Sequence, residues 1–395
     1  MTPPPPPLPA DRARAQAANA RAMAALRAGD APAAILAARE AAEADPQALS
    51  LWINLALACR TGGDTPGERE ALERALDLDR LDFTAQLRMA QLLQREGEET
   101  KALIAWDGVR QLAQHFPGLP DAVRAELSVG TAYCETLRTR IAQATQAALS
   151  SDTDARDETE QRRIDAFAGV ALGQRRIFMN ECAGVHYPFL PADEFFDHRH
   201  FPWFAALEAE AGAIRAELEA LLAEPGEAVR PYVRMEPGSP ENKWTALDGS
   251  LDWSACFLWE YGIPNAAVIE RCPHTAHVLE SLPLARIPGR APNAFFSMLR
   301  PRSRIPAHTG VTNTRAIVHL ALDVPPGCGF RVGGETRQWV EGKAFAFDDT
   351  IEHEAWNDSD ERRAVLIIDA WNPHLSAREC AAISAYFAAN DLALG

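Results

Sequence analysis

Small residues recur every 34 positions over the first third of the chain. Gly29, Gly63 and Gly97 keep this spacing; alanines precede them by seven positions, and small or apolar residues follow them by twelve (Ala22, Ala56, Ala90; Ala41, Ala75, Val109). Small residues at fixed positions let two helices pack closely, and a glycine between them ends the first helix in a left-handed turn. The period predicts three helix–turn–helix units over residues 15–48, 49–82 and 83–116.

This pattern resembles tetratricopeptide repeats. Trp52 stands where such repeats often carry an aromatic residue, whereas Glu68 takes the place of a usual small residue and Arg80 that of a usual proline. The resemblance implies a short helical solenoid. Two roles stay open for it: a groove that binds a partner protein or peptide, and a plain spacer or dimerisation surface.

Helical spacing predicts further helices over residues 117–150, 155–185 and about 203–223, with a polar linker at Ser150–Asp154. The third of these helices is amphipathic, so we expect it to cover the outside of the following domain. His198 and His200 form an HxH pair in front of it. The pair suits metal ligation or a surface turn, and a turn is favoured because no third ligand lies nearby in the sequence.

From Ala294 onwards, short apolar and alternating segments are separated by Pro-Pro-Gly, Gly-Gly-Glu and Asp-Ser-Asp turns. Short strands at this spacing predict a double-stranded β-helix, that is, a jelly-roll or cupin barrel. The fold class is therefore α+β and multidomain. The chain divides into a disordered proline-rich tail (1–14), a helical repeat domain (15–150), a connecting helix and linker (151–186) and a barrel domain with flanking helices (187–395).

The last two predicted strands, EHEAWN and RRAVLIIDAW, are joined by Asp-Ser-Asp, so we expect an antiparallel hairpin. If Asn357 pairs with Arg363, then His353 pairs with Ile367, and all four side chains share one face. Arg363 would stand roughly 10–13 Å along this ladder from His353, at about 3.3 Å per residue. That spacing suits a five-carbon diacid held between a metal and a guanidinium, whose planar fork binds carboxylates well.

The composition of the chain limits the classes of partner that it can bind. The formal net charge of −16 disfavours nucleic acid and anionic membrane surfaces, which reward clustered Lys and Arg. No run of about 18 apolar residues predicts a transmembrane helix, and the N-terminus does not resemble a signal peptide. The seven widely spaced cysteines indicate free thiols, although Cys256 and Cys272 are candidates for a pair. We therefore expect a cytoplasmic protein.

The blocks HTGVTNTR, IVHL and FDDTIEHEAWN, then Arg363 and DAWNP, resemble the aspartyl/asparaginyl β-hydroxylase family of 2-oxoglutarate oxygenases. The resemblance covers Ser297–Pro373 and extends more weakly upstream to about residue 187. It implies that His308 and His353 bind Fe(II). It also implies that Arg363, assisted by Ser297, holds the distal carboxylate of 2-oxoglutarate, and that His319 contacts this cosubstrate near the metal.

Gly310 and Ile317 stand out within this resemblance. Most non-haem iron oxygenases use two histidines and a carboxylate, but Gly310 cannot ligate a metal, and the family also lacks that carboxylate. A water at that position, held by an acid such as Asp349, is one solution. Halogenating relatives share a small residue there, so this block alone does not exclude halogenation. Ile317 replaces a basic residue of the animal hydroxylases, while Arg315 remains.

Three arginines before His308 could replace that charge or lie in solvent, and solvent is favoured (Arg300, Arg302, Arg304). The sequence thus predicts an Fe(II)-, 2-oxoglutarate- and O2-dependent hydroxylase. Its expected target atom is Cβ of Asp or Asn. The substrate could be a peptide, a protein or the free amino acid. Alternatives are a non-catalytic module that binds a partner protein and a small diacid, a zinc cupin enzyme such as an isomerase, and a barrel whose histidines are merely hydrogen-bonded core residues.

Overall fold

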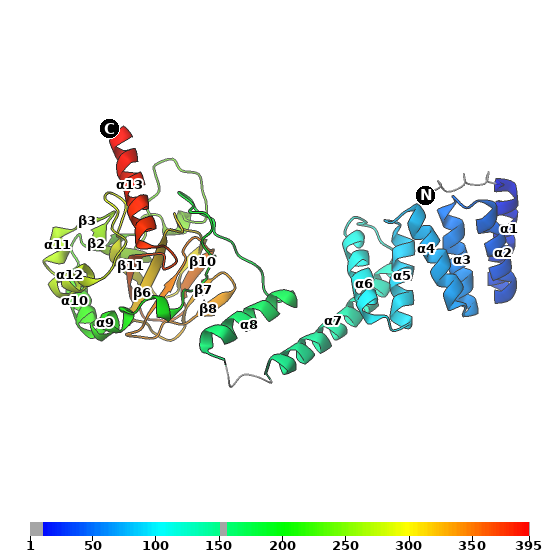
Figure 1. Cartoon of the computed structure of the whole chain (residues 1–395), viewed down its shortest axis with the longest axis horizontal. Coiled ribbons are helices and arrows are strands. Elements are labelled where there is room, and N and C mark those ends of the chain that lie inside the picture. The colour runs from blue at the N-terminus through cyan, green and yellow to red at the C-terminus, as the bar shows by residue number, and fades with distance from the viewer. Residues whose placement is uncertain (1–10, 151–155, 395) are drawn as a thin grey trace. The chain divides into compact units, whose positions relative to one another are not determined.

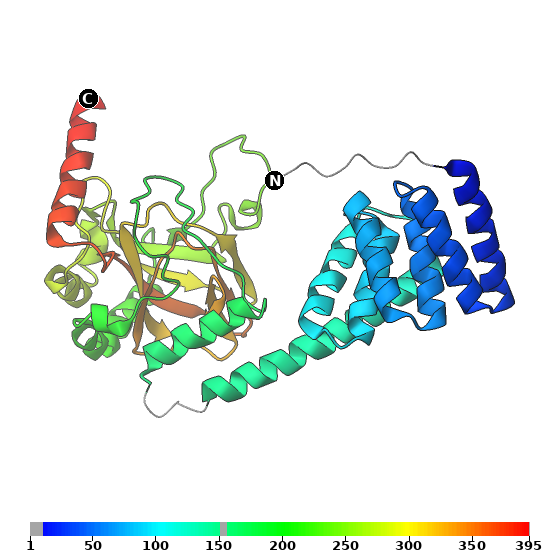
Figure 2. The same cartoon turned by 45° about the vertical axis from the view of Figure 1, so that its right-hand side comes forward.

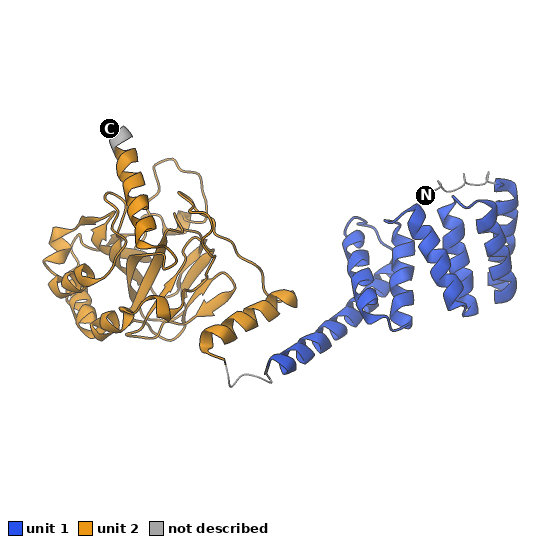
Figure 3. Cartoon of the chain, in the orientation of Figure 1, with its two compact units in different colours: residues 1–155 blue, residues 156–395 orange. Residues whose placement is uncertain are grey.

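The computed structural model describes residues 11–150 and 156–394. The chain forms two compact units, Met1–Ala155 and Arg156–Gly395, here called the repeat domain and the barrel domain (Figure 3). The division falls within the region where the sequence predicts a connecting helix and linker. Residues 151–154 of that linker, and residues 1–10 of the predicted tail, lie outside the described residues.

The repeat domain consists of paired antiparallel helices, as predicted (Figure 1). The pairs are α1 (Arg12–Ala28) with α2 (Ala31–Ala44), α3 (Leu49–Gly62) with α4 (Thr65–Leu78), and α5 (Phe83–Arg95) with α6 (Glu99–Ala113). Gly29, Gly63 and Gly97 all adopt positive φ, at 76°, 73° and 73°. The alanines at 22, 56 and 90 are fully buried where the helices meet, so the 34-residue period reports a true structural repeat.

Three boundaries differ from the prediction. Helix α1 begins at Arg12, so residues 12–14 of the predicted tail are helical. Helix α7 spans Asp121–Ser150. Helix α8 spans only Glu158–Ala171 and begins at a capping box formed by Asp157 and Glu160. The expected helix over 155–185 was therefore wrong beyond Ala171, because the chain reaches Gly173 at φ 68° and then runs on without regular structure.

The barrel domain contains two antiparallel sheets (Figures 1 and 2). The large sheet has the order β1-β2-β4-β11-β6-β9, with β3 paired to β2, and the small sheet has the order β5-β10-β7-β8. The large sheet comprises β1 (Arg230–Pro231), β2 (Trp253–Glu260), β3 (Ile263–Pro264), β4 (Ala294–Leu299), β6 (Arg315–Asp323), β9 (Ala344–Phe347) and β11 (Arg363–Trp371). The small sheet comprises β5 (Ser303–His308), β7 (Cys328–Val332), β8 (Glu335–Arg337) and β10 (His353–Asn357). This is the predicted double-stranded β-helix.

Side-chain alternation gives the large sheet two different faces. On β6, Val318 and Leu320 belong to a core covered by helices, whereas Ile317 and Ala321 face the small sheet. The covering helices are α9 (Phe204–Ala209), α10 (Ala211–Ala223), α11 (Ala266–Ile269) and α12 (Pro273–Ser281). The expected helix at 203–223 is thus two helices, α9 and α10, and it lies outside the barrel as predicted.

The expected hairpin between the last two strands was wrong. Strand β10 pairs with β5 and β7 in the small sheet, and β11 pairs with β4 and β6 in the large sheet. The connection crosses between the sheets because the buried Asn357 amide donates to the carbonyl oxygens of Leu299, Arg300 and Glu361. His353 pairs with His308, and Ile367 pairs with His319.

The remaining short elements are η2 (His198–His200), η3 (Thr245–Leu247) and the C-terminal helix α13 (Ala377–Leu394). Within η2, His198 donates to the Ala344 carbonyl, so the HxH pair forms a turn as favoured from the sequence. All seven cysteines are free, including Cys256 and Cys272. None of the helices in residues 11–150 and 156–394 has the length and apolar character needed to cross a bilayer.

Candidate active site

His308 and His353 meet across the small sheet. His308 ends β5 and His353 begins β10, and the two residues are direct antiparallel partners. Their ring centroids lie 4.1 Å apart. Neighbouring strand ends thus bring together two imidazoles that are 45 residues apart in the sequence.

Hydrogen bonds fix the tautomer of both rings. Nδ1 of His308 donates to the Pro306 carbonyl at 2.7 Å, and Nδ1 of His353 donates to the Ile351 carbonyl at 3.0 Å. Each Nε2 therefore keeps its lone pair, which is the arrangement of a metal-binding histidine whose other nitrogen is anchored. Burial lowers the pKa of His308 to about 4 and that of His353 to about 3, so both rings are neutral at physiological pH.

Asp349 occupies the space that a side chain at position 310 would need. A Cβ added to Gly310 would lie 2.0 Å from Oδ2 and 2.2 Å from Cγ of Asp349. The Gly310 amide also donates to the Asp349 carbonyl at 2.6 Å. The carboxyl group missing from position 310 is thus supplied from the turn before β10.

The carboxyl group of Asp349 is poised for an additional partner. Its Oδ1 is buried and has no hydrogen-bond partner within the described residues. Burial raises its pKa to about 7, and the charge of Arg315 opposes this rise. A buried carboxyl oxygen that lacks a partner is costly unless a ligand or water completes it.

Arg363 enters the same space from the large sheet. Its side chain is buried, with an exposed fraction of 1%, and its Nε has no hydrogen-bond partner in the described part of the chain. Its Nη1 makes only long contacts with Ser297, at 3.3 Å to the carbonyl and 3.4 Å to Oγ, and the guanidinium lies 4.9 Å from the Trp339 ring centre.

No carboxylate pairs with Arg363 within the described ranges, and burial lowers its pKa to about 10. A buried cation is strongly disfavoured until an anion joins it. The site is therefore built to receive an anionic group, and Ser297 supplies a hydroxyl beside it.

His319, on β6, lines the same cavity as Arg363 and the two histidines His308 and His353. Its Nδ1 accepts a hydrogen bond from Nε1 of Trp339 at 3.3 Å. Burial, together with the charge of Arg363, lowers its pKa well below the ordinary value, so the ring is neutral with its proton on Nε2. His319 can thus donate one hydrogen bond into the cavity.

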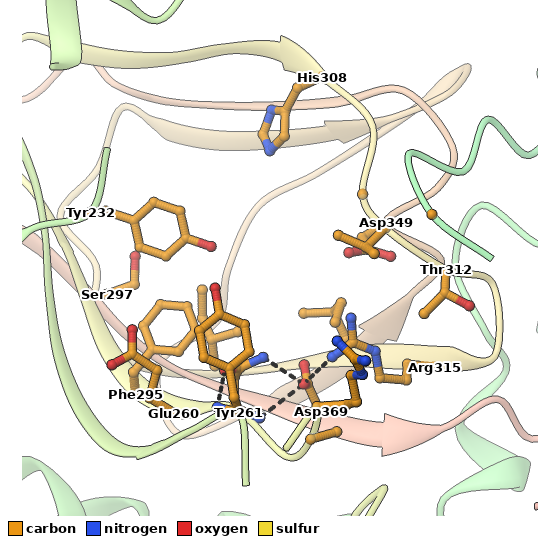
Figure 4. Close-up of a pocket in the computed structure, with 18 of the residues that line it drawn as sticks. Tyr232, Glu260, Tyr261, Phe295, Ser297, His308, Thr312, Arg315, Asp349 and Asp369 are labelled. Carbon is orange, nitrogen blue, oxygen red and sulfur yellow. Dashed lines mark hydrogen bonds and ion pairs between the residues drawn. The ribbon is translucent and has the colours of Figure 1, made fainter. Parts of the chain in front are cut away.

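All of these side chains line one cavity of about 1060 Å³ between the two sheets. Figure 4 shows His308 facing it, with Tyr232 and Ser297 on one side and Asp349 and Arg315 on the other. The expectation that His353 and Arg363 share one face of a hairpin was wrong, because they lie on different sheets, yet both line this cavity. The reason is that both sheets direct their inner faces into this cavity.

The second half of the cavity was not anticipated from the sequence. Arg315 donates to Oδ2 of Asp369 at 2.5 Å, and the Asn293 side chain binds the same oxygen at 3.0 Å. Tyr232 and Phe295 form stacked rings along one wall. The alternation on β6 and β11 puts Arg315 and Asp369 on the inner face, which an alignment of the correct strand pairs would have revealed.

The surrounding basic and aromatic residues have separate roles. Three exposed arginines bind acidic partners at the surface, as favoured from the sequence (Arg300–Asp252, Arg302–Asp360, Arg304–Asp358). Trp253 lines the cavity and donates to Ser297 Oγ at 3.1 Å. Trp244 packs against His308, with ring centroids 4.9 Å apart, whereas Trp259 lies in the core on the outer face.

The donor set fits a two-histidine iron site. No group of three or more His, Cys, Asp or Glu side chains that could hold a metal ion occurs within the described residues. Neutral imidazole suits Fe(II), and the buried carboxyl group of Asp349 can hold a metal-bound water. The roles assigned to Ser297, His308, His319, His353 and Arg363 remain predictions that this geometry accommodates.

Comparison with known proteins shows which family the barrel domain resembles. Residues 208–373 match the family described as aspartyl/asparaginyl beta-hydroxylase. The chain is 34% identical over 219 residues to the ornithine lipid ester-linked acyl 2-hydroxylase of Rhizobium tropici, covering 52% of this chain and 74% of that protein. It is 37% identical over 129 residues to human aspartyl/asparaginyl beta-hydroxylase, covering 32% of this chain but only 17% of that protein.

The repeat domain has its own structural neighbours. The TPR2B domain of yeast Sti1, solved as a complex with pHsp70, is 19% identical, with a TM-score of 0.29. This match covers 32% of this chain and 98% of the Sti1 chain.

Proposed function

This chain belongs to the aspartyl/asparaginyl β-hydroxylase family of 2-oxoglutarate-dependent hydroxylases, and we propose that it hydroxylates a methylene carbon next to a carbonyl group. The first candidate is Cβ of an Asp or Asn residue in a peptide or protein. The proposal rests on one observation: a single cavity holds two neutral histidines, whose Nδ1 atoms are anchored, and a buried arginine that pairs with no acid among the described residues.

Each residue has a task in this proposal. His308 and His353 would hold Fe(II) through Nε2. Arg363 and the Ser297 hydroxyl would bind the distal carboxylate of 2-oxoglutarate, and His319 would donate to the same cosubstrate nearer the metal. Bound Fe(II), with O2 and 2-oxoglutarate, supplies the oxidising power for an unactivated C–H bond.

The remaining tasks concern the third position on the metal and the exclusion of bulk water. The carboxyl group of Asp349 would fix a water molecule in the position that a third protein ligand takes elsewhere. When ionised, the same carboxyl group would repel a halide beside Gly310, and it therefore favours hydroxylation over halogenation. The two sheets enclose the cavity, and the aromatic side chains that line it, such as Trp253 and Phe347, would shield the reacting atoms from bulk water.

A second candidate is C2 of a fatty acyl chain, which is also a methylene beside a carbonyl carbon. The Rhizobium relative is named for an acyl 2-hydroxylation. Two observations favour this candidate: Ile317 presents an apolar side chain to the cavity, and Arg315 is already neutralised by Asp369. The stacked Tyr232, Phe257 and Phe295 rings extend that apolar wall.

We further propose that the repeat domain binds a partner or substrate protein. Its three helix pairs leave Leu36, Leu81 and Ile104 exposed, each at more than two thirds of its surface. Contiguous exposed apolar patches mark interaction surfaces, so substitution of these three residues by serine tests whether the repeat domain binds a partner through them.

Succinate formation tests the proposed reaction. The purified chain, with Fe(II), ascorbate and O2, should convert 2-oxoglutarate to succinate and should convert an accepted substrate to a product heavier by one oxygen atom. Asp- and Asn-containing peptides and acyl lipids are supplied in parallel reactions. Tight binding of 2-oxoglutarate without succinate, with every substrate offered, would show a binding module instead. Zinc rather than iron after anaerobic purification would favour the cupin isomerase.

A further inference from the structure

A short segment that precedes the family match crosses the outside of the metal site. Residues Asn180–Tyr187, here called the strap, have no regular secondary structure. They follow α8 by nine residues and end well before residue 208, where the family match begins. Gly184 and Val185 of the strap line the reaction cavity.

The strap binds the loop that follows His308. The Ala183 amide donates to the Gly310 carbonyl at 3.0 Å, and the Gly184 amide donates to the Val311 carbonyl at 2.8 Å. A Cβ at Gly184 would lie 2.9 Å from Val311 Cγ1 and 3.2 Å from its carbonyl oxygen. The two segments therefore approach as closely as they do only because residue 184 lacks a side chain.

The strap also binds the turn that precedes His353. The side-chain amide of Asn180 donates to Oδ2 of Asp348 at 2.7 Å and to Oγ1 of Thr350 at 3.0 Å. The Glu181 amide donates to the Thr350 carbonyl at 2.8 Å. Asp348 and Thr350 flank Asp349, so Asn180 fixes both neighbours of that carboxyl.

A third set of bonds anchors the far end of the strap. The Tyr187 amide donates to Oδ1 of Asn313, and the Asn313 side-chain amide donates to the Tyr187 carbonyl, both at 2.8 Å. The Asn372 side chain in turn donates to the Asn313 carbonyl at 2.9 Å. The strap is thus bonded at both ends to loops that carry site residues.

We infer that the strap is a positioning element of the active site: it presses the Gly310 loop against the Asp349 turn and so sets where the Asp349 carboxyl lies relative to His308 and His353. Within the described residues, the hydrogen bonds of the strap go to the Gly310 loop, the Asp349 turn and Asn313, and those of Ser297 go to Trp253 and Arg363. The strap therefore governs the metal side of the cavity and not the distal carboxylate side. This inference rests on the proposed function for the identity of the metal, but the contacts of the strap do not depend on turnover.

Two substitutions separate positioning from general stability. Gly184→Ala would push Val311 outwards, and Gly212→Ala is its matched control, because a Cβ at Gly212 in α10 meets nothing within 4 Å. Asn180→Ala removes the two side-chain bonds to the Asp349 turn and leaves the backbone bond from Glu181. Met179→Ala is its neighbouring control, since Met179 is 66% exposed.

The first readout is metal affinity, measured by titrating the metal-free protein with Mn(II). Gly184→Ala and Asn180→Ala should each weaken it by about tenfold, the lower end of the range for lost outer-shell partners. The second readout is 2-oxoglutarate turnover, in which the ratio of hydroxylated product to succinate should fall while the KM for 2-oxoglutarate stays near the wild-type value. Both controls should match wild type.

The inference is overturned if both strap variants keep wild-type Mn(II) affinity and coupling, even where their Tm falls. It is also overturned if the KM for 2-oxoglutarate rises while Mn(II) affinity is unchanged, because the strap would then act on the cosubstrate side. Absence of succinate in the wild-type protein would refute the proposed function alone, since Mn(II) binding would still report on the strap.

Discussion

Replacing Arg363 with methionine should separate its cost to folding from its value in binding. Burial lowers the pKa of Arg363 by roughly two units below its ordinary value, to about 10. At 1.36 kcal/mol per pKa unit, burying this charge without an anionic partner costs about 3 kcal/mol. The cation–π contact between Arg363 and the Trp339 ring, 4.9 Å away, offsets about 2 kcal/mol of this cost. The substitution to methionine would lose that contact.

The cosubstrate-free Arg363→Met protein should therefore be more stable than wild type by about 1 kcal/mol, a rise in the Tm of the barrel domain of about 2–4 °C. Methionine is unbranched and fills irregular space, so little packing is lost. The pH dependence has a definite sign. Above about pH 10 the folded guanidinium releases its proton while the unfolded one still holds it. Wild-type stability therefore rises there, and the stability difference between Arg363→Met and wild type narrows.

Binding should change in the opposite direction. Removing one partner of a buried charge pair costs on the order of 2–5 kcal/mol, a factor of about 30 to several thousand in affinity. Calorimetric titration of the Mn(II)-loaded protein with 2-oxoglutarate measures this loss. Saturating 2-oxoglutarate at 100 times Kd should stabilise wild type by about 2.7 kcal/mol, but not the variant.

The surface variant Arg302→Met serves as the control, because Arg302 lies exposed beside Asp360. It should leave both stability and cosubstrate binding unchanged. The reasoning is refuted if Arg363→Met lowers the free energy of unfolding by more than about 2 kcal/mol and leaves 2-oxoglutarate affinity intact. Arg363 would then be a structural residue.

Three further predictions follow from the site and the repeats. His308→Ala and His353→Ala should each remove succinate formation by more than the roughly 10–100-fold loss typical of outer-shell changes, with unchanged circular dichroism; turnover near wild type would contradict the metal assignment. Gly310→Ala should lower the free energy of unfolding by about 1–3 kcal/mol through overpacking, whereas Gly310→Asp combined with Asp349→Gly should restore the Tm; equal Tm values for the single and double variants would contradict the contact. Glu68→Ala, which removes a buried carboxylate with one unpaired oxygen, should leave the Tm of the repeat domain unchanged or raise it; a loss above about 1 kcal/mol in a thermal scan would show that the carboxylate stabilises the repeats.

The sequence predicted features that depend on local spacing. The 34-residue period required only that glycines and alanines return to equivalent positions, and Gly29, Gly63 and Gly97 adopt one backbone conformation. The barrel strands were found because turns with Gly, Pro and Asp separate them. The family resemblance then named the histidines and Arg363, and the structure places them in one cavity.

The sequence did not predict features that depend on how strands and loops meet. A short turn after Asn357 resembles a hairpin turn, and only the buried amide bonds of Asn357 show that the chain changes sheets there. The strap carries no strand pattern, so its contacts with Gly310 and Val311 were invisible. Arg315 and Asp369 needed the correct pairing of β6 with β11 before their ion pair could be recognised.

The contact between Gly310 and Asp349 also limits the mutational paths open to this site. A carboxylate at position 310 would recreate the usual third ligand, yet the first carbon of any such side chain would collide with Asp349. Loss of Asp349 alone would leave two imidazoles without an acid beside them. Either single step is harmful while both together are tolerable, which is sign epistasis. Lineages with this pair are thereby held at two protein ligands, and directed evolution toward three would have to change both codons at once.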